Sequence, residues 1–141
     1  MLIIHSNRES ERAAKSLAIM ENQIMTTPTP MRAPWGDIAP RLTEITDRVL
    51  FDDVWRRSEL SPRDRSLVTV AALVAGYRQN ELPFHLAKAL ENGITREEIV
   101  EAITHLAFYS GWPTASTALT VARQVFGEQN IQSKEQENAD A

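Results

Sequence analysis

The chain has 141 residues, a net charge of −4, no cysteine, and 43% hydrophobic residues. This length and composition fit one globular domain with a packed core. The lack of cysteine excludes disulfides and thiolate chemistry within this sequence. The acidic balance, without a dense stripe of lysine and arginine, argues against nucleic acid as a partner. A small anion could still be attracted by a few local arginines.

Residues 1–34 differ from the rest of the chain. Their end, TTPTPMRAP, is rich in threonine and proline and cannot continue a helix, so we expect a flexible N-terminal extension. The start, MLII, is too short for a signal peptide. The longest apolar run, LVTVAALVAGY, is about half a membrane span. We therefore expect a cytoplasmic protein without a membrane partner.

The first predicted helix covers residues 36–55. Its apolar side chains recur at steps of four, three and four residues, at Ile38, Leu42, Ile45 and Val49. This spacing places them on one face of an α-helix.

The second predicted helix begins at Pro62, with Ser61 as its N-cap and Asp64 in the first turn. It continues as RSLVTVAALVAGY, which is apolar almost all round. Burial of each large side chain contributes roughly 1.5–3 kcal/mol, and five short helices cannot cover this one fully. We therefore expect a homo-oligomer.

Three more helices are predicted between residue 80 and residue 127. The first starts at Asn80 as a cap and ends at Asn92-Gly93, where glycine favours a left-handed stop. Thr95 and Glu98 then form the capping box of a helix that ends at Ser110-Gly111.

Pro113 opens the last predicted helix, and Gly127 ends it. The polar residues that follow, 128–141, have almost nothing to bury, so a disordered tail is expected. Five helices with short joints predict an all-α, single-domain helical bundle over residues 35–127.

Glu81 and His85 lie one turn apart on the third of these helices, at the edge of its apolar face. A carboxylate bonded to one ring nitrogen would fix the tautomer and leave the other nitrogen free to move a proton. The same spacing also occurs as an ordinary helix-supporting pair, contributing only ~0.2–0.5 kcal/mol. Both interpretations stay open on spacing alone.

A metal site would need more ligands than this pair. His105 could in principle join Glu81 and His85, but no second histidine motif with ligand spacing is present. His105 more simply packs as a half-buried helix residue. We expect no metal.

Four motifs occur in order between Trp55 and Phe126. They are R-S-L-V-T, E-x-x-x-H, N-G-x-T-x-E-E-I and H-L-A-x-Y-x-G-W-P. Together they resemble the carboxymuconolactone decarboxylase family. The resemblance implies a bundle of the alkyl hydroperoxidase D-like type that assembles as a homotrimer or homohexamer.

Redox relatives of that family carry C-x-x-C-x-x-x-H. His85 matches the histidine of this motif, whereas Arg78 and Glu81 stand at its two cysteine positions. A thiol peroxidase mechanism is therefore closed to this chain, and any relation to peroxidases is one of ancestry.

The resemblance implies decarboxylation of a small lactone such as 4-carboxymuconolactone. No cofactor is expected, because the substrate carries its own electron sink. We assign His85 as the proton donor, with Glu81 orienting it and favouring the imidazolium form. Arg65 is the candidate anchor for a substrate carboxylate, and an ordinary salt bridge is an equally good interpretation of it.

Other residues have weaker assignments. Tyr109 and Trp112 are expected to line the substrate pocket, although aromatic residues at a helix end often only pack. Arg78 and Lys88 could attract the anion or could simply be solvated. A non-catalytic oligomeric or ligand-binding member of the family is the alternative function.

Overall fold

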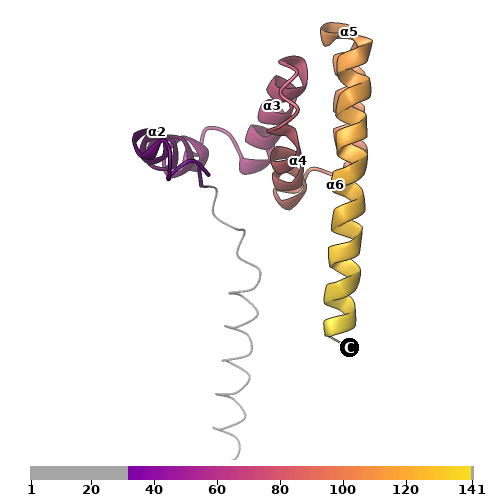
Figure 1. Ribbon diagram of the computed structural model, residues 1–141. Helices are drawn as coiled ribbons and strands as arrows, with labels where there is room; N and C mark the ends of the chain where they lie inside the picture. Colours follow the sequence, from indigo (N-terminus) through magenta and orange to yellow (C-terminus); the bar gives the residue numbers. More distant parts are fainter. Residues whose placement is uncertain (1–31, 141) are drawn as a thin grey trace, which may run out of the picture. The chain divides into compact units, whose positions relative to one another are not determined.

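The computed structural model describes residues 32–140, which lie within one compact unit. Every regular element in this part is a helix, so the predicted all-α class is confirmed (Figure 1). The elements are α2 (Pro40–Ile45), the π-helix η1 (Thr46–Phe51), the 3₁₀ helix η2 (Val54–Arg56), α3 (Pro62–Ala75), α4 (Leu82–Glu91), α5 (Arg96–Ser110) and α6 (Trp112–Ala139).

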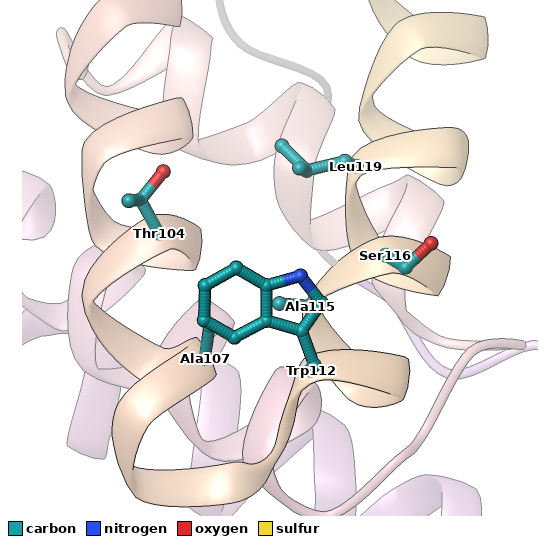
Figure 2. Close-up of a pocket in the computed structure, with 6 residues that line it drawn as sticks. All are labelled: Thr104, Ala107, Trp112, Ala115, Ser116 and Leu119. Atoms are coloured by element: carbon teal, nitrogen blue, oxygen red, sulfur yellow. The ribbon is translucent and has the colours of Figure 1, made fainter.

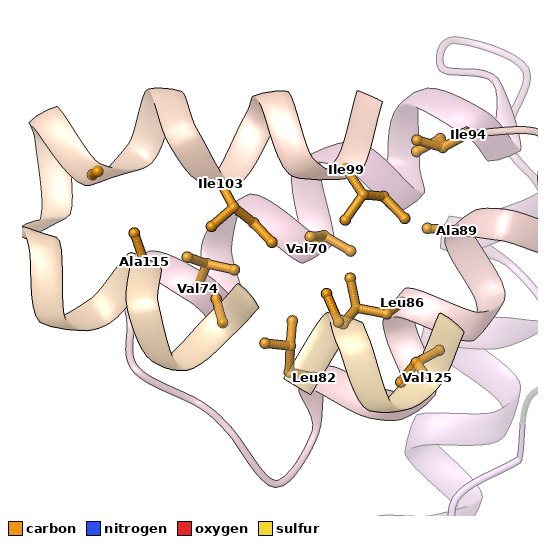
Figure 3. Packing of buried hydrophobic residues seen from close by; sticks show 13 residues of the cluster. Val70, Val74, Leu82, Leu86, Ala89, Ile94, Ile99, Ile103, Ala115 and Val125 are labelled. Carbon is orange, nitrogen blue, oxygen red and sulfur yellow. The ribbon is translucent and has the colours of Figure 1, made fainter. Parts of the chain in front are cut away.

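The core lies among α3, α4, α5 and α6. Helix α3 packs against α4 and α5, and α5 packs along α6. Figure 3 shows Val70, Leu86 and Ile103 pointing into this shared interior. The members of the core are aliphatic, and several are alanines that let the helices approach closely: Val70, Val74, Leu82, Leu86, Ala89, Ile94, Ile99, Ile103, Ala107, Ala115, Ala118, Ala122 and Val125.

The predicted ends of α3 and α5 are confirmed by their hydrogen bonds. Ser61 Oγ accepts from the backbone N–H of Asp64 at 3.0 Å. At the start of α5, Thr95 Oγ1 accepts from the Glu98 N–H, and the Glu98 carboxylate accepts from the Thr95 N–H. These bonds satisfy N–H groups that have no partner within a helix.

The two predicted glycine stops are also confirmed. Gly93 follows α4 with a φ of +94°, and Gly111 follows α5 with a φ of +96°. A side chain at either φ would be strained, so glycine fits these joints.

The single helix predicted for residues 36–55 is wrong. Helix α2 starts only at Pro40, continues as the π-helix η1, and is followed by the 3₁₀ turn η2. In η1 the N–H of Asp52 donates to the carbonyl of Asp47, which is five residues earlier. The apolar stripe of Ile38, Leu42, Ile45 and Val49 is exposed, because no described element of this chain packs over it.

The predicted end of the last helix at Gly127 is wrong, and the structure describes most of the segment that was expected to be disordered as helix. Helix α6 runs through Gly127 to Ala139. The segment after Gly127 is rich in glutamate and glutamine, which are good helix formers, and one interior glycine costs only about 1 kcal/mol. Despite this length, none of the helices described is long and apolar enough to cross a bilayer.

The chain before α2 is tied to η1. The N–H of Ala33 donates to Asp47 Oδ1 at 2.8 Å, and Arg32 Nη1 donates to Asp52 Oδ1 at 3.1 Å. Residues 32–34, which the sequence assigned to the N-terminal extension, therefore belong to the compact unit. Residues 1–31 of that extension lie outside the described residues.

Candidate active site

The start of α4 places His85 beside the core. Leu82 and Leu86 are fully buried and fix this end of the helix. Glu81 is the N-cap residue, without a side-chain capping bond, so the predicted cap at Asn80 is wrong. Pro83 lies in the first turn, where its missing N–H removes no helical bond.

A cavity of about 470 Å³ opens beside this turn. Its volume is within the range usual for small-molecule sites. Three stretches of chain line it: the segment before α2, the helix η1, and the start of α4. The lining residues are Arg32, Ala33, Pro34, Trp35, Thr46, Phe51, Asn80, Glu81, Phe84 and His85.

The His85 ring is held by aromatic neighbours. Trp55 of η2 stacks on it, with 6.5 Å between ring centroids and 19° between planes. Phe84 meets it edge-on, with centroids 5.1 Å apart. Nδ1 of His85 is buried and has no hydrogen-bond partner in the described chain. A buried unpaired N–H is costly, which favours the neutral tautomer with its hydrogen on Nε2.

The pKa of His85 is lowered from its ordinary value. Burial lowers it by disfavouring the charged ring, and the nearby Glu81 carboxylate opposes this by raising it. The expected hydrogen bond from the His85 ring to the Glu81 carboxylate is not formed. Within residues 32–140, Nδ1 has no partner, and Glu81 is exposed. Glu81 therefore acts on His85 through its charge, and burial outweighs that charge in the free protein.

Arg65 is not among the residues that line this cavity. Its Nη2 donates to the backbone carbonyl of Arg57 at 3.0 Å, and its Nε is buried with no hydrogen-bond partner among the described residues. The lining arginine is Arg32 instead. Sequence reasoning missed Arg32 because it follows a threonine- and proline-rich stretch that carries no helical pattern.

Tyr109 and Trp112 do not line the His85 cavity either. Trp112 borders a separate hollow of about 240 Å³, where Figure 2 shows its indole between α5 and α6. Tyr109 is 76% exposed and lies against His105, with ring centroids 4.8 Å apart. His105 is exposed rather than half-buried.

The remaining candidates also lie elsewhere. Arg78 is exposed and does not line the cavity. Lys88 is buried and donates to Glu91 Oε2 at 2.9 Å. Within residues 32–140, no three histidine, aspartate or glutamate side chains gather as a metal site.

Comparisons with known proteins cover the part of the chain that contains η1 and α4. The model of the carboxymuconolactone decarboxylase family matches residues 40–124. A 4-carboxymuconolactone decarboxylase of Acinetobacter baylyi is 39% identical over 60% of this chain and 63% of its own length. The nitrosuccinic acid decarboxylase npaB of Metarhizium robertsii is 35% identical over 60% of this chain and 59% of its own length.

A third match is longer and more distant. An uncharacterised 15.0 kDa protein of Paracoccus denitrificans is 24% identical over 91% of this chain and 90% of its own length. The chain thus covers less than two thirds of the length of each of the two decarboxylases. Both of these relatives are named as decarboxylases.

Proposed function

Because the chain belongs to the carboxymuconolactone decarboxylase family, we propose that it is a cofactor-independent carboxy-lyase. Its substrate is a small carboxylated lactone of the 4-carboxymuconolactone type. The observation that supports this most is the cavity of about 470 Å³ lined by both His85 and Arg32. It brings a proton-transfer group and a cation together at a space that admits a small anion.

The reaction needs an electron sink, and the substrate contains one. When the carbon–carbon bond to the carboxylate breaks, carbon dioxide leaves and the electron pair moves through the adjacent C=C into the lactone carbonyl. The resulting dienolate takes one proton at carbon to give the enol-lactone. The protein has to bind the anion, stabilise the oxyanion and deliver that proton.

The two named relatives suggest one substrate class. Nitrosuccinic acid also combines a carboxylate with a strong electron acceptor, since its nitro group can take up the electron pair that the lactone carbonyl takes up in the other case. We therefore include small nitro-substituted dicarboxylates among the candidate substrates of this chain.

His85 delivers the proton as imidazolium. In the free protein, burial keeps its pKa low, so the ring is mostly neutral near pH 7. A bound anion beside the ring adds negative charge to that of Glu81 and raises the pKa again. Substrate binding thus generates the acid where it is needed, and a solvent proton restores it after turnover.

Self-association is part of the same proposal. In the described part of the chain, α2 and η1 bury no residue, and Phe108, Tyr109 and Trp112 are largely exposed. Apolar surfaces of this kind usually meet another subunit. We propose a bundle of the alkyl hydroperoxidase D-like type that assembles as a homotrimer or homohexamer.

The experiment is a decarboxylation assay on the purified full chain with 4-carboxymuconolactone and with nitrosuccinic acid. Loss of substrate absorbance and release of carbon dioxide are followed together. We expect His85→Gln to lower kcat by about 10²- to 10⁴-fold, and the exposed His105→Gln to match the parent protein.

Two outcomes would contradict the proposal. If neither compound is decarboxylated, the alternative of a non-catalytic, ligand-binding family member becomes the better interpretation. If His85→Gln keeps full activity, the assigned proton donor is wrong even though the reaction is right.

A further inference from the structure

Arg32 supplies a positive charge to the His85 cavity from outside the helical core. It lines the cavity together with Ala33, Pro34 and Trp35, which form a continuous wall before α2. This wall is fixed to η1 by the Ala33 N–H, which donates to Asp47 Oδ1 at 2.8 Å. The position of Arg32 is therefore set by backbone bonding as well as by its own side chain.

The charges that line the cavity are few. Arg32 and Glu81 carry them at neutral pH, because burial keeps His85 mostly neutral. Among the described lining residues, Arg32 is thus the only fixed cation. A negatively charged group that enters the cavity is attracted by Arg32 and repelled by Glu81, so the two side chains give the ligand a preferred orientation.

The hydrogen-bonding capacity of Arg32 is only partly used. Its one bond within residues 32–140 runs from Nη1 to Asp52 Oδ1 at 3.1 Å, whereas a guanidinium has five N–H donors. Asp52 Oδ1 also accepts from Arg56 Nη2 at 3.4 Å, so it keeps a cationic partner if Arg32 turns away. An exposed ion pair of this kind contributes little stability, so Arg32 loses little free energy when it exchanges Asp52 for a ligand carboxylate.

We propose that Arg32 is the carboxylate-binding residue of this cavity and selects small dicarboxylates over uncharged analogues. This inference rests on the proposed function for the identity of the substrate. A guanidinium can bind a carboxylate through two parallel hydrogen bonds. Arg32 then holds the carboxylate that stays on the substrate, and the departing one faces the His85 side of the cavity.

The test measures binding separately from turnover. Succinate, and its uncharged diamide succinamide, are titrated into the parent chain by isothermal calorimetry. The variants are Arg32→Gln, Arg32→Lys and the control Arg41→Gln. Arg41 is likewise exposed and pairs with Glu44, but it does not line the cavity. Circular dichroism confirms that each variant is folded.

We expect Arg32→Gln to bind succinate about 10- to 100-fold more weakly than the parent, with Arg32→Lys in between and Arg41→Gln unchanged. Succinamide should bind weakly to the parent and to all variants, and its affinity should not change with the substitutions at Arg32. In the decarboxylation assay, KM should rise in Arg32→Gln much more than kcat falls.

The inference is overturned if the parent chain does not bind succinate, or if Arg32→Gln binds it as the parent does. It is also overturned if Arg65→Gln loses succinate binding while Arg32→Gln keeps it. A third combination separates the two proposals. If the parent chain decarboxylates neither substrate but binds succinate, and Arg32→Gln loses that binding, the anion site is supported and the enzyme function is contradicted.

Discussion

Trp55 and His85 stack nearly parallel, with 6.5 Å between ring centroids and 19° between planes. The two residues come from η2 and α4, so the 3₁₀ turn that follows η1 positions the ring assigned as proton donor. No hydrogen bond from the described residues reaches its Nδ1. The orientation of His85 therefore depends on aromatic packing.

Trp55→Ala should lower kcat by about 10-fold or more, because a ring that is free to rotate is less often in a productive position. Trp55→Phe, which keeps a flat aromatic neighbour, should retain most of the activity. Turnover is measured well below the melting temperature, since the alanine variant should also lose about 1–3 kcal/mol of stability. Equal kcat in all three proteins would show that the stacking does not position the ring.

The pH dependence of turnover should differ between free and substrate-bound protein. Burial lowers the pKa of His85 in the free chain, and the bound anion raises it. Both kcat/KM and kcat should fall as pH rises, because the imidazolium form is lost. The fall in kcat should occur at higher pH than the fall in kcat/KM, since only kcat reports the complex.

Glu81→Gln removes a charge that raises the pKa of His85. The pH profiles of kcat and of kcat/KM should therefore both move to lower pH in that variant. Profiles that coincide with those of the parent would mean that Glu81 has no electrostatic influence on the proton donor.

Stability should depend on pH through the same residue. Because the folded pKa of His85 lies below the ordinary 6.5, the unfolded chain binds a proton first as pH falls. The contribution of neutral His85 to the free energy of unfolding should thus be complete above about pH 7. It should be lost progressively as pH falls below 6.5. Urea titrations between pH 7.5 and about 5.5 should show a smaller decrease for His85→Gln than for the parent.

Glu98 provides a contrast at more acidic pH. Its pKa is lowered, first by the backbone hydrogen bond from Thr95 and next by Arg63, so its stabilising effect is lost only as pH falls below the ordinary 4.5. The pH range in which His85 changes the stability is therefore separate from the more acidic range in which Glu98 does. Identical pH slopes for the parent and His85→Gln above pH 5.5 would contradict the assigned shift.

Leu86 should be among the most sensitive core positions. Its side chain is fully buried between α4 and the other core helices. Leu86→Ala should lower the free energy of unfolding by about 2–5 kcal/mol, through lost burial and the cavity it leaves. The control Ile131→Ala, on the exposed half of α6, should change it by less than about 0.5 kcal/mol. Denaturant titrations at one protein concentration measure both, and a change below 1 kcal/mol for Leu86→Ala would contradict the described core.

Phe108 should report on assembly. It is 75% exposed on α5 and contacts Trp112, which is 67% exposed, edge-on, with ring centroids 5.6 Å apart. Light scattering should find a trimer or hexamer for the parent, and Phe108→Glu should shift it toward smaller species, since a buried unpaired charge is costly. Ile131→Glu, far along α6, should keep the parent's size. A monomeric parent at micromolar concentration would refute the proposed self-association.

Local chemistry in the sequence predicts several of the helix ends, although the cap at Asn80 is wrong because Glu81 caps α4. The Ser61 cap, the box of Thr95 and Glu98, and the stops at Gly93 and Gly111 all depend on bonds or dihedral angles within a few residues. Such features follow from residue type and spacing alone. The continuation of α6 past Gly127 was missed because a glycine can either end a helix or lie inside one at small cost.

The candidate site was harder to predict because it combines distant segments. His85 and Glu81 could be chosen from their spacing, but the wall that faces them comes from residues about 50 positions earlier. Motifs point to Arg65 and Trp112, but nothing in a motif states which cavity a side chain faces. The absence of a Glu81–His85 hydrogen bond likewise depends on side-chain conformation.

The segment of residues 32–35 lies ahead of residues 40–124, the region in which this chain matches its family. Two homologues that are alike in every helix therefore accept different molecules wherever they differ in the segment that closes one side of the cavity. Exchanging this short stretch between relatives is then a direct way to alter substrate preference while leaving the helical scaffold intact.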